Sequence, residues 1–437
     1  MANTYLTRTP SSTGNRKILT ISCWFKRSNV SSTQTLFANG GNSYNRDYIS
    51  FESNQLVVAR YDNAYIYQIK TNRVFRDINS WYHLMVAFDT TEDSSDNRIK
   101  IYINGVRETS FATNTRPALN VDTWYNYAGY LQNIGVDYDN AGNDFNGSMS
   151  YVALVDGKAE LPTIFGETDS ATGQWKIKTS IIPSSGWGTN GFLILKNGNS
   201  VTDQSGNSNN FTVAGGTLTK TEDCPSNVFC TFNPLLQGVP SRELIYSNGN
   251  GTIEASASTW MPSGSTLAVP PKTGKWYWEF SQFVSTQIFV GLMSSECNIN
   301  LSLPYQASDG LITYFYAGRL TNNGSETESY FTAISAQTDV IGVALDMTAG
   351  TYGQAQFYRN GSATGAAVSL SSAFADKFVM PFGMCNGSGR KVSINTGNGY
   401  FGTTAVSSAG TAASTPGIFE YDVPTGYQPL STKGLNA

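Results

Sequence analysis

Apolar and polar residues alternate along much of the chain in short runs, which is the two-residue period of a strand with one buried face. Four such runs follow one another between Lys17 and Ser110, with turn residues between them. These runs are KILTISCWFKR, YISFESNQLVVARY, WYHLMVAFDT and NRIKIYINGVRETSF. Helical periodicity is absent from this region, so the pattern predicts antiparallel strands.

A polar, acidic stretch, TTEDSSDN, separates Asp89 from Arg98 and predicts a solvated hairpin loop. The strands that it joins are expected to bury six side chains: Leu84, Val86, Phe88, Ile99, Tyr102 and Ile103. One more strand and a short helical segment opened by Pro162 follow before Glu167. We therefore expect a first sandwich that spans residues 1–167.

The pattern loosens over residues 168–273, where Gly, Asn, Ser and Pro separate short apolar pieces, and this predicts an ordered connector with a few edge strands. Regular strand signals return over residues 274–401 and predict a second antiparallel sandwich. Residues 402–437 are expected to form a terminal segment. Its apolar anchors are Phe419, Tyr421, Val423 and Tyr427. The predicted fold class is all-β, with two jelly-roll-like sandwiches joined by a Gly/Asn/Ser-rich connector.

Composition agrees with strands and turns. Charged residues make up 14% of the 437 residues, below the ~25% usual for soluble domains, whereas the chain contains 24 Tyr, 23 Phe and 42 Gly. The net charge is -4 and the 28 Lys and Arg form no basic run, so we expect no nucleic-acid partner. No stretch approaches ~18 apolar residues and the start lacks an apolar core, so we expect neither membrane insertion nor a Sec signal.

The cysteines are odd in number and scattered, which is typical of neither a disulfide framework nor a zinc site. They are Cys23, Cys224, Cys230, Cys297 and Cys385. Most are expected to be reduced and buried, which suits assembly in a cytoplasm. A bridge between Cys224 and Cys230 remains an alternative on spacing.

Candidate catalytic chemistry is sparse. The one histidine, His83, lies in a strand without a nucleophile motif such as GxSxG, so we interpret it as a sandwich-face residue beside Trp81. A single histidine also excludes multi-histidine metal sites. A glycosidase needs only two carboxylates, but no E-x-D-x-E pattern occurs, and Glu92 and Asp93 lie in a loop. We therefore predict no enzymatic activity, although carboxylates distant in sequence can converge.

One loop, DQSGNSNN, has the oxygen-rich spacing of a calcium site. The candidate ligands are Asp203, Ser205, Asn207 and Asn209. The same residues also form a good Asx-turn, in which a side-chain oxygen accepts a backbone N–H. A Ca²⁺ ion that holds the connector is one interpretation and a metal-free turn is the other; no further cofactor is expected.

Sugar recognition uses an aromatic ring against the apolar face of the sugar, with amides or carboxylates for its hydroxyls. Two segments are rich enough in aromatic residues to be candidates. The first set is Tyr61, Tyr65 and Tyr67, and the second is Trp124, Tyr125, Tyr127 and Tyr130. Packing in a core or a subunit interface is the alternative for both sets, since Tyr and Trp also dominate protein interfaces.

The residues WYHLMVAFDT and RIKIYINGV resemble the paired central strands of laminin-G and concanavalin-A-like lectin domains. The later segment FNGSMSYVALVDG resembles the strand by which such domains close. This resemblance covers about residues 1–167 and implies a binding-type sandwich.

The second half looks like a SPRY domain, because GKWYWEF, FVGLM, DVIGVALDM, QFYRNG and MPFGM occur in that family's order between Lys275 and Met384. The segment KVSINTGNGYF departs from the family's late aromatic strand. For this reason, no peptide-binding residues are transferred from SPRY relatives.

The segments DQSGNSNNFTVAGG, DCPSNVFCTFNPL and YDVPTGYQPLSTKGL look like segments that recur in large structural proteins of marine tailed phages. This resemblance implies a virion protein such as a tail fibre, a spike or a capsid-surface protein. Its expected location is the surface of the particle after assembly in the host cytoplasm. Its expected partners are other virion proteins and host-surface polysaccharide.

Two rival functions remain open. A bacterial lectin-like adhesin would share both sandwiches but should carry an export signal or anchor, and a polysaccharide-degrading glycosidase would require two convergent carboxylates. A homo-oligomer is compatible with the chain, but the chain contains no heptad or collagen-like repeat from which the number of subunits could be predicted.

Overall fold

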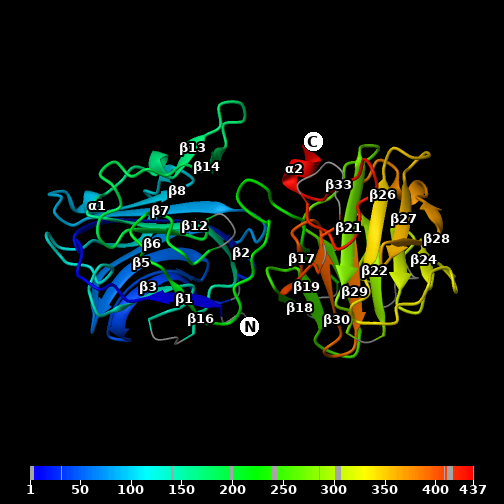
Figure 1. The fold of residues 1–437 in the computed structure, drawn as a ribbon, viewed down its shortest axis with the longest axis horizontal. Coiled ribbons are helices and arrows are strands. Elements are labelled where there is room, and N and C mark those ends of the chain that lie inside the picture. The colour runs from blue at the N-terminus through cyan, green and yellow to red at the C-terminus, as the bar shows by residue number, and fades with distance from the viewer. Residues whose placement is uncertain are drawn as a thin grey trace. The chain divides into compact units, whose positions relative to one another are not determined.

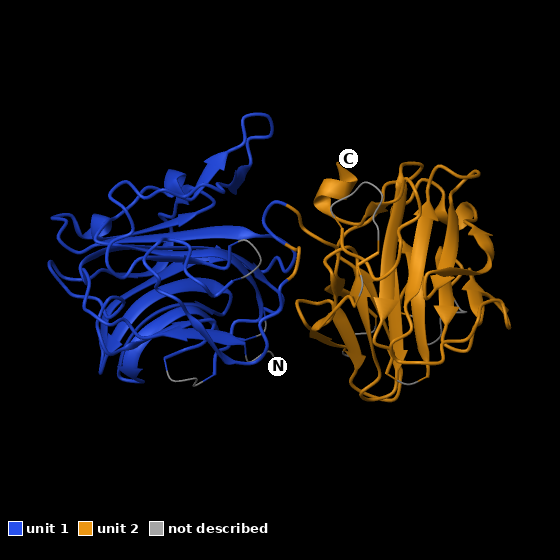
Figure 2. Ribbon diagram, viewed as in Figure 1, with its two compact units in different colours: residues 1–220, 224–226 blue, residues 221–223, 227–437 orange. Residues whose placement is uncertain are grey.

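The computed structural model describes residues 4–30, 32–138, 142–196, 200–238, 244–284, 286–300, 307–407, 409–410 and 417–436. Strands account for 46% of the described residues and helices for 3%, so the predicted all-β fold is confirmed. Two compact units are present, residues 1–220 with 224–226 and residues 221–223 with 227–437 (Figure 2). Neither α-helix in the described part of the chain has the length required to cross a bilayer.

The first unit contains an eight-stranded sheet, here called sheet A, in the order β10-β6-β5-β4-β3-β11-β1-β16 (Figure 1). The strands are β10 (Phe111–Thr115), β6 (Tyr65–Val74), β5 (Gln55–Asp62), β4 (Asn45–Glu52), β3 (Gln34–Asn42), β11 (Leu131–Ile134), β1 (Tyr5–Arg8) and β16 (Thr212–Gly215). All of its pairings are antiparallel. Successive strands β3 to β6 are joined by tight two-residue turns, Ser43-Tyr44, Ser53-Asn54 and Asn63-Ala64.

The opposing sheet of this unit, sheet B, has the order β15-β12-β2-β7-β8-β9. The strands are β15 (Phe192–Ile194), β12 (Gly147–Asp156), β2 (Ile18–Arg27), β7 (Tyr82–Asp89), β8 (Ile99–Ile103) and β9 (Val106–Arg107). A one-turn helix α1 (Ser95–Arg98) lies in the acidic loop, and a 3-10 turn (Pro162–Ile164) stands where Pro162 predicted a helical segment. A hairpin of β13 (Gly166–Thr168) and β14 (Trp175–Ile177) follows.

The core of the first unit lies between sheets A and B. Five of the six side chains predicted to be buried lie in it: Leu84, Val86, Phe88, Ile99 and Ile103. The sixth, Tyr102, points to the opposite face of sheet B, where it packs with Met85 under the residues that follow β12. Fully burying a side chain of this size contributes roughly 1.5–3 kcal/mol, so this interior is the main stabilising feature of the unit.

The second unit is a sandwich of two further sheets. Sheet C consists of β17 (Phe232–Gln237), β20 (Trp260–Ser265), β29 (Val379–Asn386), β22 (Ile288–Ser294), β23 (Leu311–Phe315), β24 (Leu320–Asn322) and β25 (Ser325–Thr327). Sheet D consists of β18 (Leu244–Ser247), β19 (Thr252–Ala255), β30 (Lys391–Asn395), β21 (Lys275–Ser281), β26 (Ile341–Asp346), β27 (Gln354–Arg359) and β28 (Ser362–Ser369). A 3-10 turn (Ser372–Phe374) precedes β29, and β31 (Tyr400–Phe401) pairs with β32 (Thr404–Ala405).

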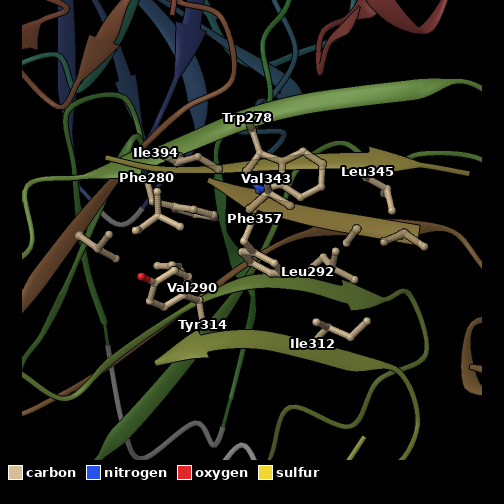
Figure 3. Packing of buried hydrophobic residues seen from close by; sticks show 14 of the residues in the cluster. Trp278, Phe280, Val290, Leu292, Ile312, Tyr314, Val343, Leu345, Phe357 and Ile394 are labelled. Carbon is tan, nitrogen blue, oxygen red and sulfur yellow. The ribbon is translucent and has the colours of Figure 1, made fainter. Parts of the chain in front are cut away.

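Aromatic and branched side chains fill the space between sheets C and D (Figure 3). Trp278 and Phe280 of β21 are fully buried there, together with Val290 and Leu292 of β22. Both strands were predicted from apolar and aromatic runs bounded by turn residues, and side chains at alternate positions of each strand meet in this core.

The C-terminal segment closes the second unit. Its strand β33 (Gln428–Pro429) pairs in parallel with β21, and helix α2 (Thr432–Leu435) follows. Phe419 and Val423 pack on the outer face of sheet D, whereas Leu430 enters the main core. The terminal segment is therefore an integral part of the sandwich.

Residues 168–273 differ from the expected connector because they divide between the two units. β15 extends sheet B beside β12, and β16 extends sheet A beside β1. β17 to β20 belong in the same way to sheets C and D. The assignment of residues changes from the first unit to the second at residues 221–226, and the segment between the predicted sandwiches contributes strands to both units.

All five cysteines are free thiols, and four of them are buried. This confirms the prediction for most of them, and the alternative bridge is not formed. Cys230 is buried, whereas the Cys224 Sγ lies 3.3 Å from the Ser226 hydroxyl. Burial raises the pKa of the Cys230 thiol, so it is an unreactive apolar group.

Candidate functional site

The two predicted aromatic sets come together at one end of the first unit, here called the aromatic end. It is built from the β3–β4 turn, the β5–β6 turn and the segment that leads into β11. A β-carbon at Gly41 would lie 3.1 Å from the Tyr130 ring, so the second set packs directly on strand β3. The guanidinium carbon of Arg60, on β5, lies 4.6 Å from the centre of the Trp124 ring.

The accessible part of the aromatic end is a tyrosine platform, which consists of Tyr44, Tyr61 and Tyr65. Tyr44 is 59% exposed and Tyr65 is 47% exposed. The Tyr61 and Tyr65 rings meet edge to face with centres 5.2 Å apart, which holds both in place. Tyr48 lies beneath them, 5% exposed, with its hydroxyl 3.4 Å from that of Tyr65.

Polar side chains surround the tyrosine platform because both turns are rich in Asn and Asp. The group consists of Asn42, Asn45, Asp62 and Asn63. Asn42 fixes the β3–β4 turn by accepting the backbone N–H groups of Tyr44 and Asn45. The Asn63 N–H donates to the Tyr44 carbonyl at 2.9 Å, which ties the two turns together. Amide and carboxylate groups therefore lie beside exposed rings, as sugar recognition requires.

The rings of the second aromatic set largely cover one another. Trp124, Tyr127 and Tyr130 pack on one another with ring centres 4.9–5.3 Å apart. The Arg16 guanidinium carbon lies 4.7 Å from the centres of both the Trp124 and Tyr127 rings. Ring faces already covered by neighbouring rings and by Arg16 and Arg60 offer little stacking surface to a ligand, so we do not place a sugar site on this cluster.

Asp47 joins the two aromatic sets from inside. Its carboxylate accepts the Tyr67 hydroxyl at 2.6 Å and also accepts the backbone N–H of Trp124. Burial raises the pKa of Asp47 to about 6, while the nearby Arg60 opposes that rise. At neutral pH the group is a carboxylate that anchors the second set to β4.

Two of the predicted ligand-contacting residues belong instead to the core, since Tyr67 is 0% exposed and Tyr125 is 3% exposed. The physical reason for Tyr67 is a register shift between β5 and β6. Arg60 pairs with Tyr67 and Tyr61 pairs with Tyr65, so β6 contains one extra residue at this point. Such a bulge places Tyr65 and Tyr67 on opposite faces, although a regular strand would place them on one face.

The loop predicted as a calcium site is a hydrogen-bonded turn. The Asp203 carboxylate accepts the backbone N–H groups of Leu193, Ser205 and Asn209 at 2.8–2.9 Å. The amide groups of Asn207 and Asn209 donate to the Gly191 carbonyl. This is the Asx-turn alternative, with side-chain atoms already engaged in the protein. Within the described ranges, no three His, Cys, Asp or Glu side chains converge on one point.

His83 is fully buried on the outer face of sheet B and stacks on Trp24, with ring centres 5.1 Å apart. Its Nδ1 accepts the indole N–H of Trp175 at 3.1 Å, so Nε2 carries the proton and donates to the Ser22 hydroxyl at 2.9 Å. Burial lowers the pKa of His83 to about 3. The residue is a neutral packing group, as its place in the strand predicted, although its partners are Trp24 and Trp175.

Sequence reasoning missed Tyr44, Asp47, Arg16 and Arg60. Tyr44 lies in a turn between Ser and Asn, a context in which an exposed aromatic residue is itself a signal. Arg16 lies just before β2, whereas Asp47 and Arg60 lie in β4 and β5. The roles of all three depend on long-range contacts with Trp124. No local pattern marks such residues.

Comparison with known families gives two matches. Residues 2–164 match the family Laminin_G_3, described as the concanavalin A-like lectin/glucanases superfamily, and residues 275–399 match the SPRY domain family. Both predicted domain resemblances are thereby confirmed. The comparison with curated proteins gives no match.

Solved structures with similar folds include two human SPRY domains and one pentraxin. The SPRY domain of human HERC1 is 20% identical, with a TM-score of 0.30, over 37% of this chain and 96% of that one. A second human SPRY domain is 18% identical, with a TM-score of 0.29, over 35% and 93%. The heptameric SAP-like pentraxin from Limulus polyphemus is 18% identical, with a TM-score of 0.28, over 36% and 72%.

Proposed function

We propose that this chain, which joins a concanavalin-like domain of the laminin G type to a SPRY domain, is a non-enzymatic structural and adhesive protein of a tailed-phage particle. It is assembled in the host cytoplasm and lies on the particle surface. Its sandwiches contact other virion proteins, and the tyrosine platform binds glycans of the host surface.

The tyrosine platform is the observation that carries the adhesive part of the proposal. Tyr44 and Tyr65 offer exposed rings on turns that are fixed by hydrogen bonds, next to Asp62 and Asn63. A sugar ring can stack its apolar face on a tyrosine while its hydroxyls bond to the amide and carboxylate groups. Such binding requires complementarity alone, with no covalent step.

The virion part is supported by the three segments that look like parts of phage structural proteins. In this chain they close the two units: the Asp203 loop packs against β15, Cys230 bonds to the Leu430 carbonyl through its backbone N–H, and Leu430 enters the core. Well-packed domains of this kind suit a particle that must survive outside a cell.

The proposal is tested by determining which proteins are present in phage particles purified from the host that expresses the gene. Mass spectrometry should detect the chain at a fixed number of copies per particle, and antibodies raised against the first unit should decorate intact particles. Particles that lack the chain, or decoration only after the particles are disrupted, would contradict the proposal.

A further inference from the structure

The arginines at the aromatic end are paired with carboxylates, and this pairing affects whether the site can bind a charged or an uncharged glycan. Its three arginines each lie beside their own carboxylate. The pairs are Arg16–Asp122 at 3.5 Å, Arg46–Asp137 at 3.2 Å and Arg60–Asp62 at 3.5 Å. An arginine that is already paired has less to offer an incoming sulfate or carboxylate, because binding would displace its partner.

The guanidinium groups are also held in place by other contacts. Arg16 donates from Nε to the Thr123 carbonyl at 2.7 Å, and Arg60 donates to the Asp122 carbonyl. The Arg46 guanidinium carbon lies 5.2 Å from the Tyr48 ring centre and 5.0 Å from that of Tyr138. Turning any of these groups toward a ligand would cost both a hydrogen bond or ion pair and a ring contact.

Asp47 is a fourth carboxylate at the aromatic end, and it is buried. The arginines near it, Arg16 and Arg60, are already counted among the three pairs. Three cations therefore face four carboxylates, which leaves one negative charge in excess near neutral pH. The fourth carboxylate is buried, so solvent and salt screen its field poorly. An anionic ligand at the tyrosine platform would meet repulsion rather than attraction.

We infer that the tyrosine platform selects uncharged glycans over sulfated or uronic-acid glycans. The inference rests on the proposed function and adds the chemical class of its ligand. Stacking on Tyr44 and Tyr65 supplies affinity for any pyranose, and the paired charges supply the discrimination. Asn and Asp groups at the rim then bond to neutral hydroxyls.

The experiment measures retention of the labelled full chain on immobilised glucans, galactans and mannans, each beside its own sulfated derivative. We expect retention on at least one uncharged polymer to exceed retention on its sulfated derivative by at least tenfold. Tyr65→Ala should reduce that retention at least tenfold. Phe378→Ala, which removes a 50% exposed ring from the second unit, should leave it unchanged.

Introducing a free cation tests the discrimination directly. Ala64 is exposed at the tip of the β5–β6 turn, next to Tyr65. Ala64→Lys should raise retention on the sulfated derivative at least fivefold, whereas Ala64→Gln, of similar length without charge, should not. Both substitutions are on an exposed turn, so folding should be preserved.

These measurements distinguish glycan binding by the tyrosine platform from its preference for uncharged glycans. Stronger retention of the wild type on a sulfated polymer, lost in Tyr65→Ala, would overturn the inference of an uncharged ligand while preserving glycan binding. Retention on none of the polymers, charged or uncharged, would overturn glycan binding itself and the inference with it.

Discussion

His83 is a residue whose burial makes the stability of the first unit depend on pH. Its pKa is about 3 in the folded chain and ~6.5 when exposed to water. The unfolded chain therefore binds a proton between these values while the folded chain does not. By linkage, its contribution to stability decreases as pH falls from about 6.5 toward 3, by up to ~1.4 kcal/mol per pH unit.

His83→Gln removes this titration and keeps a polar side chain in place. We expect the difference in unfolding free energy between wild type and variant, measured by urea denaturation, to narrow on acidification from pH 6.5 to 4. Above pH 7 the difference should be constant. A difference that is independent of pH over the whole range would show that His83 is not the buried neutral group described.

For single residues, the sequence predicts the role of a side chain better than it predicts whether that side chain is exposed. The placement of His83 in a strand without a nucleophile motif was sufficient to predict a structural role. The separation of Tyr65 from Tyr67 was not predictable, because it depends on one extra residue in β6. The position of a bulge depends on how the strand pairs with its neighbour, so the sequence of β6 alone does not predict it.

The C-terminal segment is an element held by one buried carboxylate. Glu279 on β21 accepts the backbone N–H groups of Glu420 and Tyr421 at 2.9 and 3.1 Å. It also accepts the Tyr277 hydroxyl at 3.2 Å. Burial raises the pKa of Glu279 to about 7, with these hydrogen bonds opposing the rise.

Glu279→Gln should loosen this segment, because the amide nitrogen cannot accept a backbone N–H. We expect a loss of about 1–3 kcal/mol and faster chymotryptic cleavage at Phe419, Tyr421 or Tyr427. Glu328→Gln, the same change on an exposed side chain, is the matched control. Equal cleavage rates in the two variants would contradict the anchoring role.

The pH dependence of this anchor has a defined sign. The folded pKa of about 7 lies above the ordinary value of 4.5, so the folded chain retains the proton longer than the unfolded chain. The contribution of Glu279 to stability is therefore greatest below pH 4.5 and decreases as pH rises through 7. Glu279→Gln should lose this slope in the unfolding of the second unit.

The β13–β14 hairpin is a second element that depends on one contact. Trp175 covers His83 and lies over Gly105, where a β-carbon would come within 2.6 Å of the indole ring. Gly105 also has a φ of +77°, a conformation that L side chains rarely adopt. Gly105→Ala should destabilise the first unit by about 1–3 kcal/mol and raise the solvent exposure of Trp175. Unchanged melting and tryptophan quenching would contradict this packing.

For the whole molecule, the position of the boundary between the units is testable. Residues 1–220 include β15 and β16, which contribute Phe192, Ile194 and neighbouring Phe211 to the first core. Residues 1–167 lack all three of these side chains and leave β12 and β1 each with one partner strand instead of two. A fragment of residues 1–220 should unfold cooperatively, whereas residues 1–167 should be unfolded or aggregate. Equal thermal stability of the two fragments would contradict the boundary.

The long, alternating strands of both sandwiches were predictable because their period of two appears within each strand. The strands β15 to β20 were not assigned to a sandwich, because they span only three to six residues and most of their pairing is long-range. The Gly and Asn around them are typical of turns, which made the region look like a connector. Short edge strands acquire their identity from the sheet that they extend.

Binding of the labelled full chain to cells of the host tests whether the tyrosine platform is the adhesive site. The wild type should be retained saturably, soluble uncharged glycan should compete, and Tyr65→Ala should reduce retention at least tenfold while Phe378→Ala has no effect. Retention that is the same for the wild type and Tyr65→Ala would contradict the central claim that the tyrosine platform is the adhesive site.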